Sequence, residues 1–207
     1  MTAFIASMLA RRMLVALVCL VCAFALETVI AQEPATKPAP RGDPAAGKRK
    51  TAGCNGCHAV AGMKNVPSLG GQGTSYFVAA MRAYRDGMRN HTTMRDVAGQ
   101  FSERELVDLA AYYADTNAAA ECTAPSAAPA SSTQCAACHG AEGAQGATLD
   151  VPKLAGQKAA YLELALRAYR SGARKQPIMQ QQAAAVSDEQ IAELAAYYAS
   201  RTSLTVK

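Results

Sequence analysis

The sequence predicts an all-α protein built from two tandem copies of one domain, and two observations predict this fold class. Residues 66–114 match residues 151–199 at a constant offset of 85 without gaps, and 22 of these 49 positions are identical. Within each copy, apolar residues recur at helical spacing, and glycine, proline and serine residues mark the helix ends. At about 150 residues per domain, 207 residues permit one large domain or two small ones, and the repeat selects two.

The N-terminal residues are typical of an export signal. Two arginines precede an apolar run over residues 13–26, which is shorter than the roughly 20 residues that span a bilayer. We therefore expect a signal peptide over residues 1–31, cleaved after Ala31 or, as the second choice, after Ala25. Residues 32–42 contain three prolines and are expected to form a disordered leader.

The predicted helices follow the chain from this leader. The first begins with Asp43 as its N-cap and Pro44 at its first position, and runs into Cys54. The middle helix covers residues 75–86 in the first copy and 158–170 in the second, and the last helix of each copy begins with a capping box. The predicted organisation is a first domain over 43–116, a linker rich in Ala, Ser and Pro over 117–134, and a second domain over 135–207.

Four of the seven cysteines lie in two C-x-x-C-H motifs, which is the attachment pattern of c-type haem. Two thiols three positions apart can add to the two vinyl groups of one porphyrin, and the histidine that follows can bind its iron. A zinc ribbon needs about 15–20 residues between its cysteine pairs, whereas 77 separate these, and no strand-like alternation supports a thioredoxin-like pair. Structural disulfides would not explain the two histidines. The sequence thus predicts two covalently bound haem c groups, at Cys54, Cys57 and His58 and at Cys135, Cys138 and His139.

The repeat also predicts a sixth ligand for each iron. From residue 115 onward the chain contains one methionine, Met179, and subtracting the offset of 85 gives Met94. Both methionines lie in polar surroundings that read as turns, where filling a hydrophobic core is not expected. Only His91 is left as another histidine ligand, for the first iron alone, and we interpret it as an exposed loop residue.

Together the repeat, the motifs and the methionine loops resemble the dihaem class I cytochromes c of the cytochrome c4 type, over nearly all of residues 43–207. The resemblance implies two tandem cytochrome c domains related by a pseudo-twofold axis, each around one covalent haem, with the haem propionates near each other at the interface. It also implies that His58 and Met94 ligate one iron, and that His139 and Met179 ligate the other.

One departure concerns the start of the second domain, where the family has a helix that packs on the C-terminal helix. Pro125, Pro129 and the polar run over 131–133 leave room for little more than a turn or two before Cys135. We expect the second domain to be less stable, or to depend more on its haem.

The supporting residues each have two interpretations. Arginines on the middle helices are interpreted as a solvated face, with contact to haem propionates as the alternative: Arg82, Arg85, Arg167 and Arg170. The matched Gln72 and Gln157 either bond near the haem or cap a loop, and Tyr113 and Tyr198 are expected to pack. The role of Cys122, the unpaired cysteine, stays open.

Iron that binds both His and Met has no open position for a substrate, and this ligation raises its reduction potential. We therefore expect no enzyme, but a periplasmic carrier of electrons between respiratory donors and a terminal oxidase. The alternative is a dihaem subunit of a periplasmic dehydrogenase, such as a flavocytochrome sulfide dehydrogenase; a dihaem peroxidase would need a longer chain and an open haem.

The expected partners are redox proteins, and peripheral membrane association is left open. A net charge of +5 argues against nucleic acid.

Overall fold

The computed structural model describes residues 41–58, 63–116 and 127–201, all of which belong to one compact unit, Pro40–Lys207. Secondary structure in these ranges is helical, and the only β-type pairing there is an isolated bridge between Arg89 and Arg174. The predicted signal peptide, residues 32–40 of the leader, and residues 117–126 of the linker with Cys122 lie outside the described residues. No helix in the described ranges has the length and apolar character that crossing a membrane requires.

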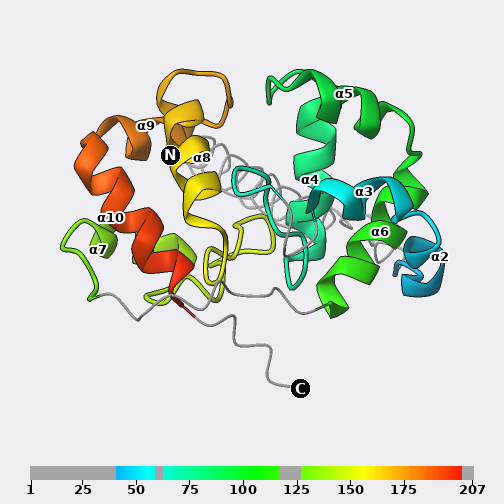
Figure 1. Ribbon diagram of the computed structural model, residues 1–207, viewed down its shortest axis with the longest axis horizontal. Coiled ribbons are helices and arrows are strands. Elements are labelled where there is room, and N and C mark those ends of the chain that lie inside the picture. The colour runs from blue at the N-terminus through cyan, green and yellow to red at the C-terminus, as the bar shows by residue number, and fades with distance from the viewer. Residues whose placement is uncertain (1–40, 59–62, 117–126, 202–207) are drawn as a thin grey trace, which may run out of the picture. The chain divides into compact units, whose positions relative to one another are not determined.

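The helices occur in matched sets, as the repeat predicts (Figure 1). The middle, methionine-bearing and last helices of the two copies start at positions 85 apart, and the motif helices end at histidines 81 apart. The first copy contains α2 (Pro44–Lys48), α3 (Ala52–His58), α4 (Thr74–Arg85), α5 (Thr92–Gly99) and α6 (Glu103–Asp115). The second contains α7 (Ser132–His139), α8 (Ala159–Arg170), α9 (Pro177–Ala184) and α10 (Asp188–Ala199).

Two details of the predicted helices are wrong. The single helix expected from Asp43 into Cys54 is two helices, α2 and α3, because the chain turns over residues 49–51. The methionines expected in turns lie instead in the short helices α5 and α9. These two helices escape a periodicity search because each is only eight residues long and buries a single alanine.

The core of the first copy lies where α4 packs on α5 and α6. Its largest fully buried side chains are Leu106 and Leu109, and Met81 also belongs to it. Helix α2 packs on α6 at very short range, because a Cβ atom at Gly47 would lie 2.1 Å from the carbonyl oxygen of Asp108. The Asp108 carboxylate also accepts a hydrogen bond from the Asp43 amide at 2.8 Å, which ties the start of α2 to α6.

The second copy has the same core, formed by α8 with α9 and α10, but no counterpart of α2 in the described residues. The described residues before α7, 127–131, contain no helix, which agrees with the departure expected from the prolines. The side chain of Tyr197 bonds the carbonyl oxygen of Ala141 at 3.1 Å, and the Arg201 guanidinium lies 4.4 Å from its ring. In the second copy, α10 is thus contacted by the loop that contains Ala141 and by the Arg201 side chain, whereas in the first copy α6 is contacted by the helix α2.

Candidate haem sites

The two motifs lie on the helices α3 and α7, and each helix ends at the motif histidine. In each motif the first cysteine is half-buried and the second is exposed, and all four are free thiols. Structural disulfides are therefore not formed by the motif cysteines. Burial raises the pKa of the Cys54 and Cys135 thiols, so both remain protonated at neutral pH. Both motifs present two thiols and an imidazole from one short helix, the donor set that a covalent haem requires.

The ring nitrogens of both motif histidines have defined roles. His58 Nδ1 donates to the carbonyl oxygen of Pro67 at 2.8 Å, and His139 Nδ1 donates to that of Pro152 at 2.9 Å. Because a carbonyl can only accept, the proton is on Nδ1 and the lone pair is on Nε2. Burial lowers the pKa of both imidazoles, which keeps them neutral at pH 7. Each histidine therefore offers Nε2 to a metal in the required tautomer.

Met94 and Met179 are the third residues of α5 and α9 and are both half-buried. Met94 packs against the core that Cys54 also contacts. The amide of Met94 donates to His91 Nδ1 at 3.3 Å, and the amide of Met179 donates to the Gln176 side chain at 2.6 Å. The His91 side chain thus acts as the N-cap of α5, which favours Met94 over His91 as a ligand.

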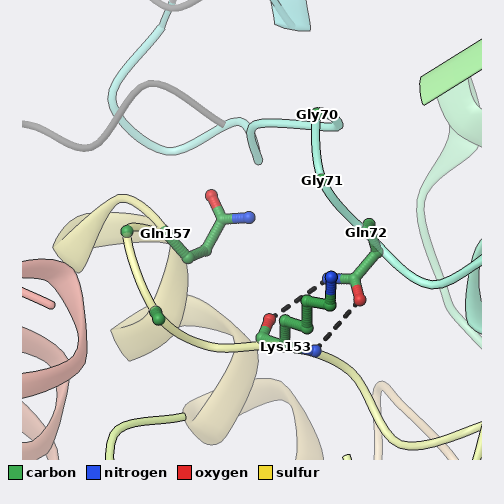
Figure 2. Close-up of a pocket in the computed structure, with 7 residues that line it drawn as sticks. Gly70, Gly71, Gln72, Lys153 and Gln157 are labelled. Carbon is green, nitrogen blue, oxygen red and sulfur yellow. Dashed lines mark hydrogen bonds between the residues drawn. The ribbon is translucent and has the colours of Figure 1, made fainter. Parts of the chain in front are cut away.

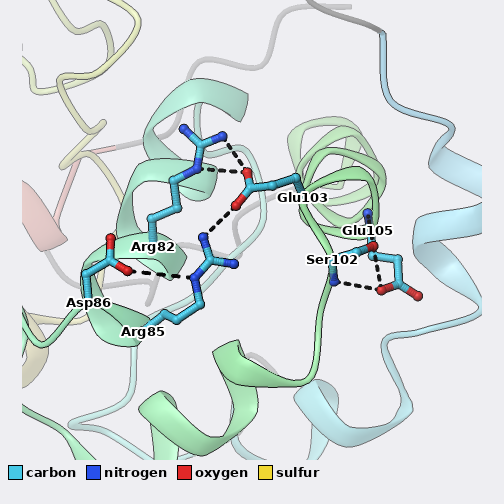
Figure 3. Close-up of polar contacts among 6 residues, drawn as sticks. All are labelled: Arg82, Arg85, Asp86, Ser102, Glu103 and Glu105. Atoms are coloured by element: carbon cyan, nitrogen blue, oxygen red, sulfur yellow. Dashed lines mark hydrogen bonds and ion pairs between the residues drawn. The ribbon is translucent and has the colours of Figure 1, made fainter.

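The paired arginines of the middle helices form ion pairs with the last helix of the same copy, and Figure 3 shows those of the first copy. Arg82 and Arg85 both bind Glu103, and their hydrogen bonds lower the pKa of this carboxyl to about 2. In the second copy, Arg167 and Arg170 bind Asp188 at 2.7 and 2.8 Å. These guanidiniums are solvent-exposed, as the sequence suggests, but each already has a carboxylate partner, so contact with haem propionates gains no support.

The two glutamines join the two copies, and Figure 2 shows one of the two contacts, between Gln72 and Lys153. The Gln72 amide group exchanges two hydrogen bonds with the backbone of Lys153, at 3.0 and 3.1 Å, and Gln157 does the same with Ser68, at 2.9 and 3.0 Å. In the register of the repeat, Gln72 corresponds to Gln157 and Ser68 corresponds to Lys153, so the two contacts are equivalent with the copies exchanged. An interface that repeats itself in this way is isologous, which is the pseudo-twofold relation expected from the resemblance.

Each glutamine also accepts a hydrogen bond from the amide that follows it, at 3.0 Å, so the loop-capping interpretation is correct but incomplete. Tyr113 and Tyr198 are buried in the two cores beside Cys54 and Cys135, and they pack as expected. Sequence reasoning missed Arg89 and Arg174, although they are identical in the register. Residue identity alone does not show that these arginines meet at the interface.

Comparisons with known proteins decide the family. A family model for cytochrome c matches residues 127–201. Cytochrome c4 from Pseudomonas aeruginosa is 32% identical to this chain over 175 residues, which cover 75% of the chain and 87% of the relative. The chain belongs to the cytochrome c4 family. As in this dihaem family, its two C-x-x-C-H motifs give two covalent haem sites, and the prediction of two haem c groups is confirmed.

Two further proteins are similar to this chain. The crystal structure of reduced recombinant cytochrome c4 from Pseudomonas stutzeri matches with a TM-score of 0.66 and 28% identity, covering 77% of this chain and 99% of that one. The thiosulfate dehydrogenase electron acceptor from Thiomonas intermedia is 31% identical over 149 residues, which cover 63% of this chain and 68% of that protein. The chain is therefore a dihaem electron-transfer cytochrome with the all-α, two-domain fold that its sequence predicts.

Proposed function

We propose that this protein carries electrons in the periplasm, one at a time at each haem, from respiratory donors to a terminal oxidase, and that it catalyses no reaction of its own. His58 and Met94 ligate the first iron, and His139 and Met179 ligate the second. The haems supply one-electron redox couples, and this ligand pair raises their potentials. The observation that carries the proposal is the matched set of donors, since it leaves neither iron a position for a substrate.

The surroundings of the ligands support this role. The carbonyl oxygens of Pro67 and Pro152 hold each histidine in the tautomer that binds iron, with no proton to lose at Nε2. The side chains of His91 and Gln176 cap the helices that carry the methionines, which holds these short helices in place. Both irons would thus receive a full set of ligands from this chain, which suits a carrier.

The periplasmic location rests on the predicted signal peptide. Fractionation of cells that express the full chain tests it, together with N-terminal sequencing of the holoprotein. A haem-containing protein in the periplasmic fraction, beginning at Gln32 or Leu26, is the expected result. Haem-containing protein that keeps Met1 or stays in the cytoplasm would overturn the location.

A second candidate function has a specific observation in its favour. The relative from Thiomonas intermedia is an electron acceptor of thiosulfate dehydrogenase, so a dehydrogenase is the alternative donor for this chain. In that role the protein would be the dihaem electron-transfer subunit of a periplasmic dehydrogenase. Both functions use the same haem sites, so the sites do not separate them.

Purification from periplasm under gentle conditions separates the two functions. A carrier elutes alone and, when reduced, is oxidised by membranes that contain a terminal oxidase. A subunit elutes with a second polypeptide, and the substrate of that polypeptide reduces its haems. Co-purification with a dehydrogenase, combined with no oxidation by the membranes, would overturn the carrier function.

A further inference from the structure

A buried lysine of the second copy contacts a loop of the first copy. Lys158 is the N-cap residue of α8 and is only 3% exposed, although lysine is among the residue types that are least often buried. Its ammonium group donates a hydrogen bond to the carbonyl oxygen of Met63 at 3.2 Å. Met63 lies 95 positions earlier, between α3 and α4. The second copy thus places a buried charge against the first.

The loop that Lys158 contacts supports the first haem site. Its Pro67 carbonyl accepts the hydrogen bond from His58 Nδ1 at 2.8 Å. Its Met63 carbonyl accepts a second bond, from the Val66 amide at 3.0 Å, so Lys158 binds the turn that leads directly to Pro67. Burial is the main cause of the lowered pKa of His58, and the charge of Lys158 lowers this pKa further. Lys158 is therefore close enough to act on the imidazole electrostatically.

The first copy cannot return this contact, because the repeat has glycine at the matching position. In the register, Lys158 corresponds to Gly73, which has no side chain to extend. Among the causes that act on His139, burial alone lowers its pKa. The glutamine contacts between the copies are matched, whereas the lysine contact runs in one direction, from the second copy to the first haem site.

The supporting loops of the two copies also differ in length. The offset between the copies is 81 at the motif histidines and 85 after the loops, so the loop of the second copy is four residues longer. This longer loop closes on its own backbone, since the Ala147 amide donates to the Cys138 carbonyl and the Leu154 amide donates to the Gly143 carbonyl, both at 2.7 Å. The described part of the shorter loop is bonded by Lys158 instead.

We propose that Lys158 is a positioning residue for the first haem, which binds the loop that supports His58 and raises the reduction potential of the first haem but not that of the second. A positive charge favours the reduced iron, which carries one positive charge less than the oxidised iron. At an effective dielectric constant of about 20, a unit charge at about 10 Å shifts a one-electron equilibrium on the order of tenfold. Lys158 thereby makes two haems with the same proposed ligands unequal. The proposal rests on His58 as a ligand of the first iron, but not on the carrier function.

The test uses the full-length holoprotein with Lys158→Met, which removes the charge and keeps an unbranched side chain. The ratio of reduced to oxidised haem is measured against a one-electron reference couple, with each haem followed by its own haem-methyl proton resonances. We expect this ratio to fall about tenfold at the first haem, which corresponds to about 59 mV, and to change less than about twofold at the second. Equal falls at both haems, or no change at the first, would overturn the proposal.

Two further variants separate charge from packing. Lys158→Arg keeps the charge, and the ratio at the first haem should stay within about threefold of the wild type, at roughly 30 mV. A fall as large as in Lys158→Met would mean that the lysine only packs, and it would overturn the role of its charge. Lys175→Met is the matched control, because Lys175 is an exposed lysine of the same copy, and both ratios should stay unchanged. An equal fall in this control would mean that net charge acts rather than position, which also overturns the proposal.

Gly73→Lys tests the same geometry in reverse and decides the matter if the Lys158 variants lose haem. A Cβ atom at Gly73 would lie 3.6 Å from the carbonyl oxygen of Leu149, which is an ordinary contact distance, in the supporting loop of the second copy. We expect the ratio to rise about threefold or more at the second haem, with the first nearly unchanged. A rise confined to the first haem, or no rise at either haem, would overturn the proposal.

The ligand assignment is checked on the same samples. The proton resonances of the axial histidine of each haem are recorded in the reduced wild type. If they are present at the first haem and Lys158→Met has no effect, the proposal alone is overturned. Their absence at the first haem would overturn the assignment of His58 and the proposal with it. Neither outcome depends on which protein donates or accepts the electrons.

Discussion

His58 and His139 each give one ring nitrogen to a proline carbonyl, and this contact leaves the other nitrogen ready for iron. The methionines proposed as further ligands, Met94 and Met179, lie in helices with caps of different chemistry, an imidazole in the first copy and an amide in the second. At the scale of single residues, the two haem sites are thus the same in their proposed ligands and different in what supports them.

The proposed ligands can be tested one iron at a time. The near-infrared charge-transfer band from methionine sulfur to ferric iron reports this ligation in the oxidised protein. Met94→Ala or Met179→Ala should each remove about half of the band and leave one iron open to cyanide. His91→Ala is the control and should keep the full band. An unchanged band in Met94→Ala, together with an altered spectrum in His91→Ala, would mean that His91 is the ligand.

At the scale of helices, α2 packs on α6 in the first copy, whereas the described residues of the second copy contain no helix before α7. Three features stabilise the contact between α2 and α6. Gly47 permits the close approach, the Asp108 carboxylate accepts a hydrogen bond at the start of α2, and Lys50 forms an ion pair with Glu105 at 2.7 Å. The stability of the first copy should therefore respond to changes at this contact, and two predictions follow from its geometry.

Replacing Gly47 with alanine should separate α2 from α6. The added methyl group would lie 2.1 Å from the carbonyl oxygen of Asp108, which is backbone and cannot move aside easily. We expect a loss of about 1–3 kcal/mol in the free energy of unfolding, measured by urea denaturation of the holoprotein. Gly99→Ala is the control, since nothing lies near its Cβ and the second copy has alanine at the matching position. Equal stability of both variants would refute the close packing.

Glu105 should make the stability of α6 depend on pH. Its hydrogen bonds with Lys50 and with Ser102 lower its pKa to about 2, below that of an unfolded chain at roughly 4.3. A lowered carboxyl pKa stabilises the folded state above the unfolded value, and this stability is lost as the pH falls from about 4.3 towards 2. The urea midpoint of the wild type should fall over this range. Glu105→Gln should show a flatter profile, and an identical profile would contradict the role of Glu105.

At the scale of the whole molecule, charge is spread thinly, with 21 basic and 16 acidic residues. The densest basic run, residues 48–50, loses one charge to the ion pair between Lys50 and Glu105. Strong electrostatic steering needs a large patch of one sign. The structure thus offers a partner only a modest positive surface, on the first copy.

Electron transfer should therefore depend weakly on salt. Stopped-flow oxidation of the reduced holoprotein by a purified terminal oxidase, repeated from low to physiological salt, measures this dependence. We expect the second-order rate constant to fall by less than about a hundredfold, because the charge product is small. Lys48→Gln should lower the rate constant more at low salt than at physiological salt. A steeper fall in the wild type would show that a strongly charged patch controls docking.

Much of this protein follows from local patterns in its sequence. The covalent haem motifs, the two copies, the capping boxes and the matched methionines all depend on residue types at short or fixed spacings, which the chain displays directly. The short helices α5 and α9 were beyond this reasoning, because they bury too little apolar surface to show helical periodicity. The predicted domain boundaries stay predictions, although α7 begins at Ser132, inside the predicted linker.

What only the tertiary structure decided is how distant residues meet. Gln157 binds Ser68 across 89 positions, and the Arg82–Glu103 pair joins α4 and α6, which the sequence separates by the whole of α5. Arg89 and Arg174 look in the sequence like other surface arginines, yet the pairing of the copies buries Arg89 and brings the two cations together, with no carboxylate partner among the described residues. Burial and long-range pairing arise from which surfaces pack against each other, and that depends on the whole fold rather than on any one segment.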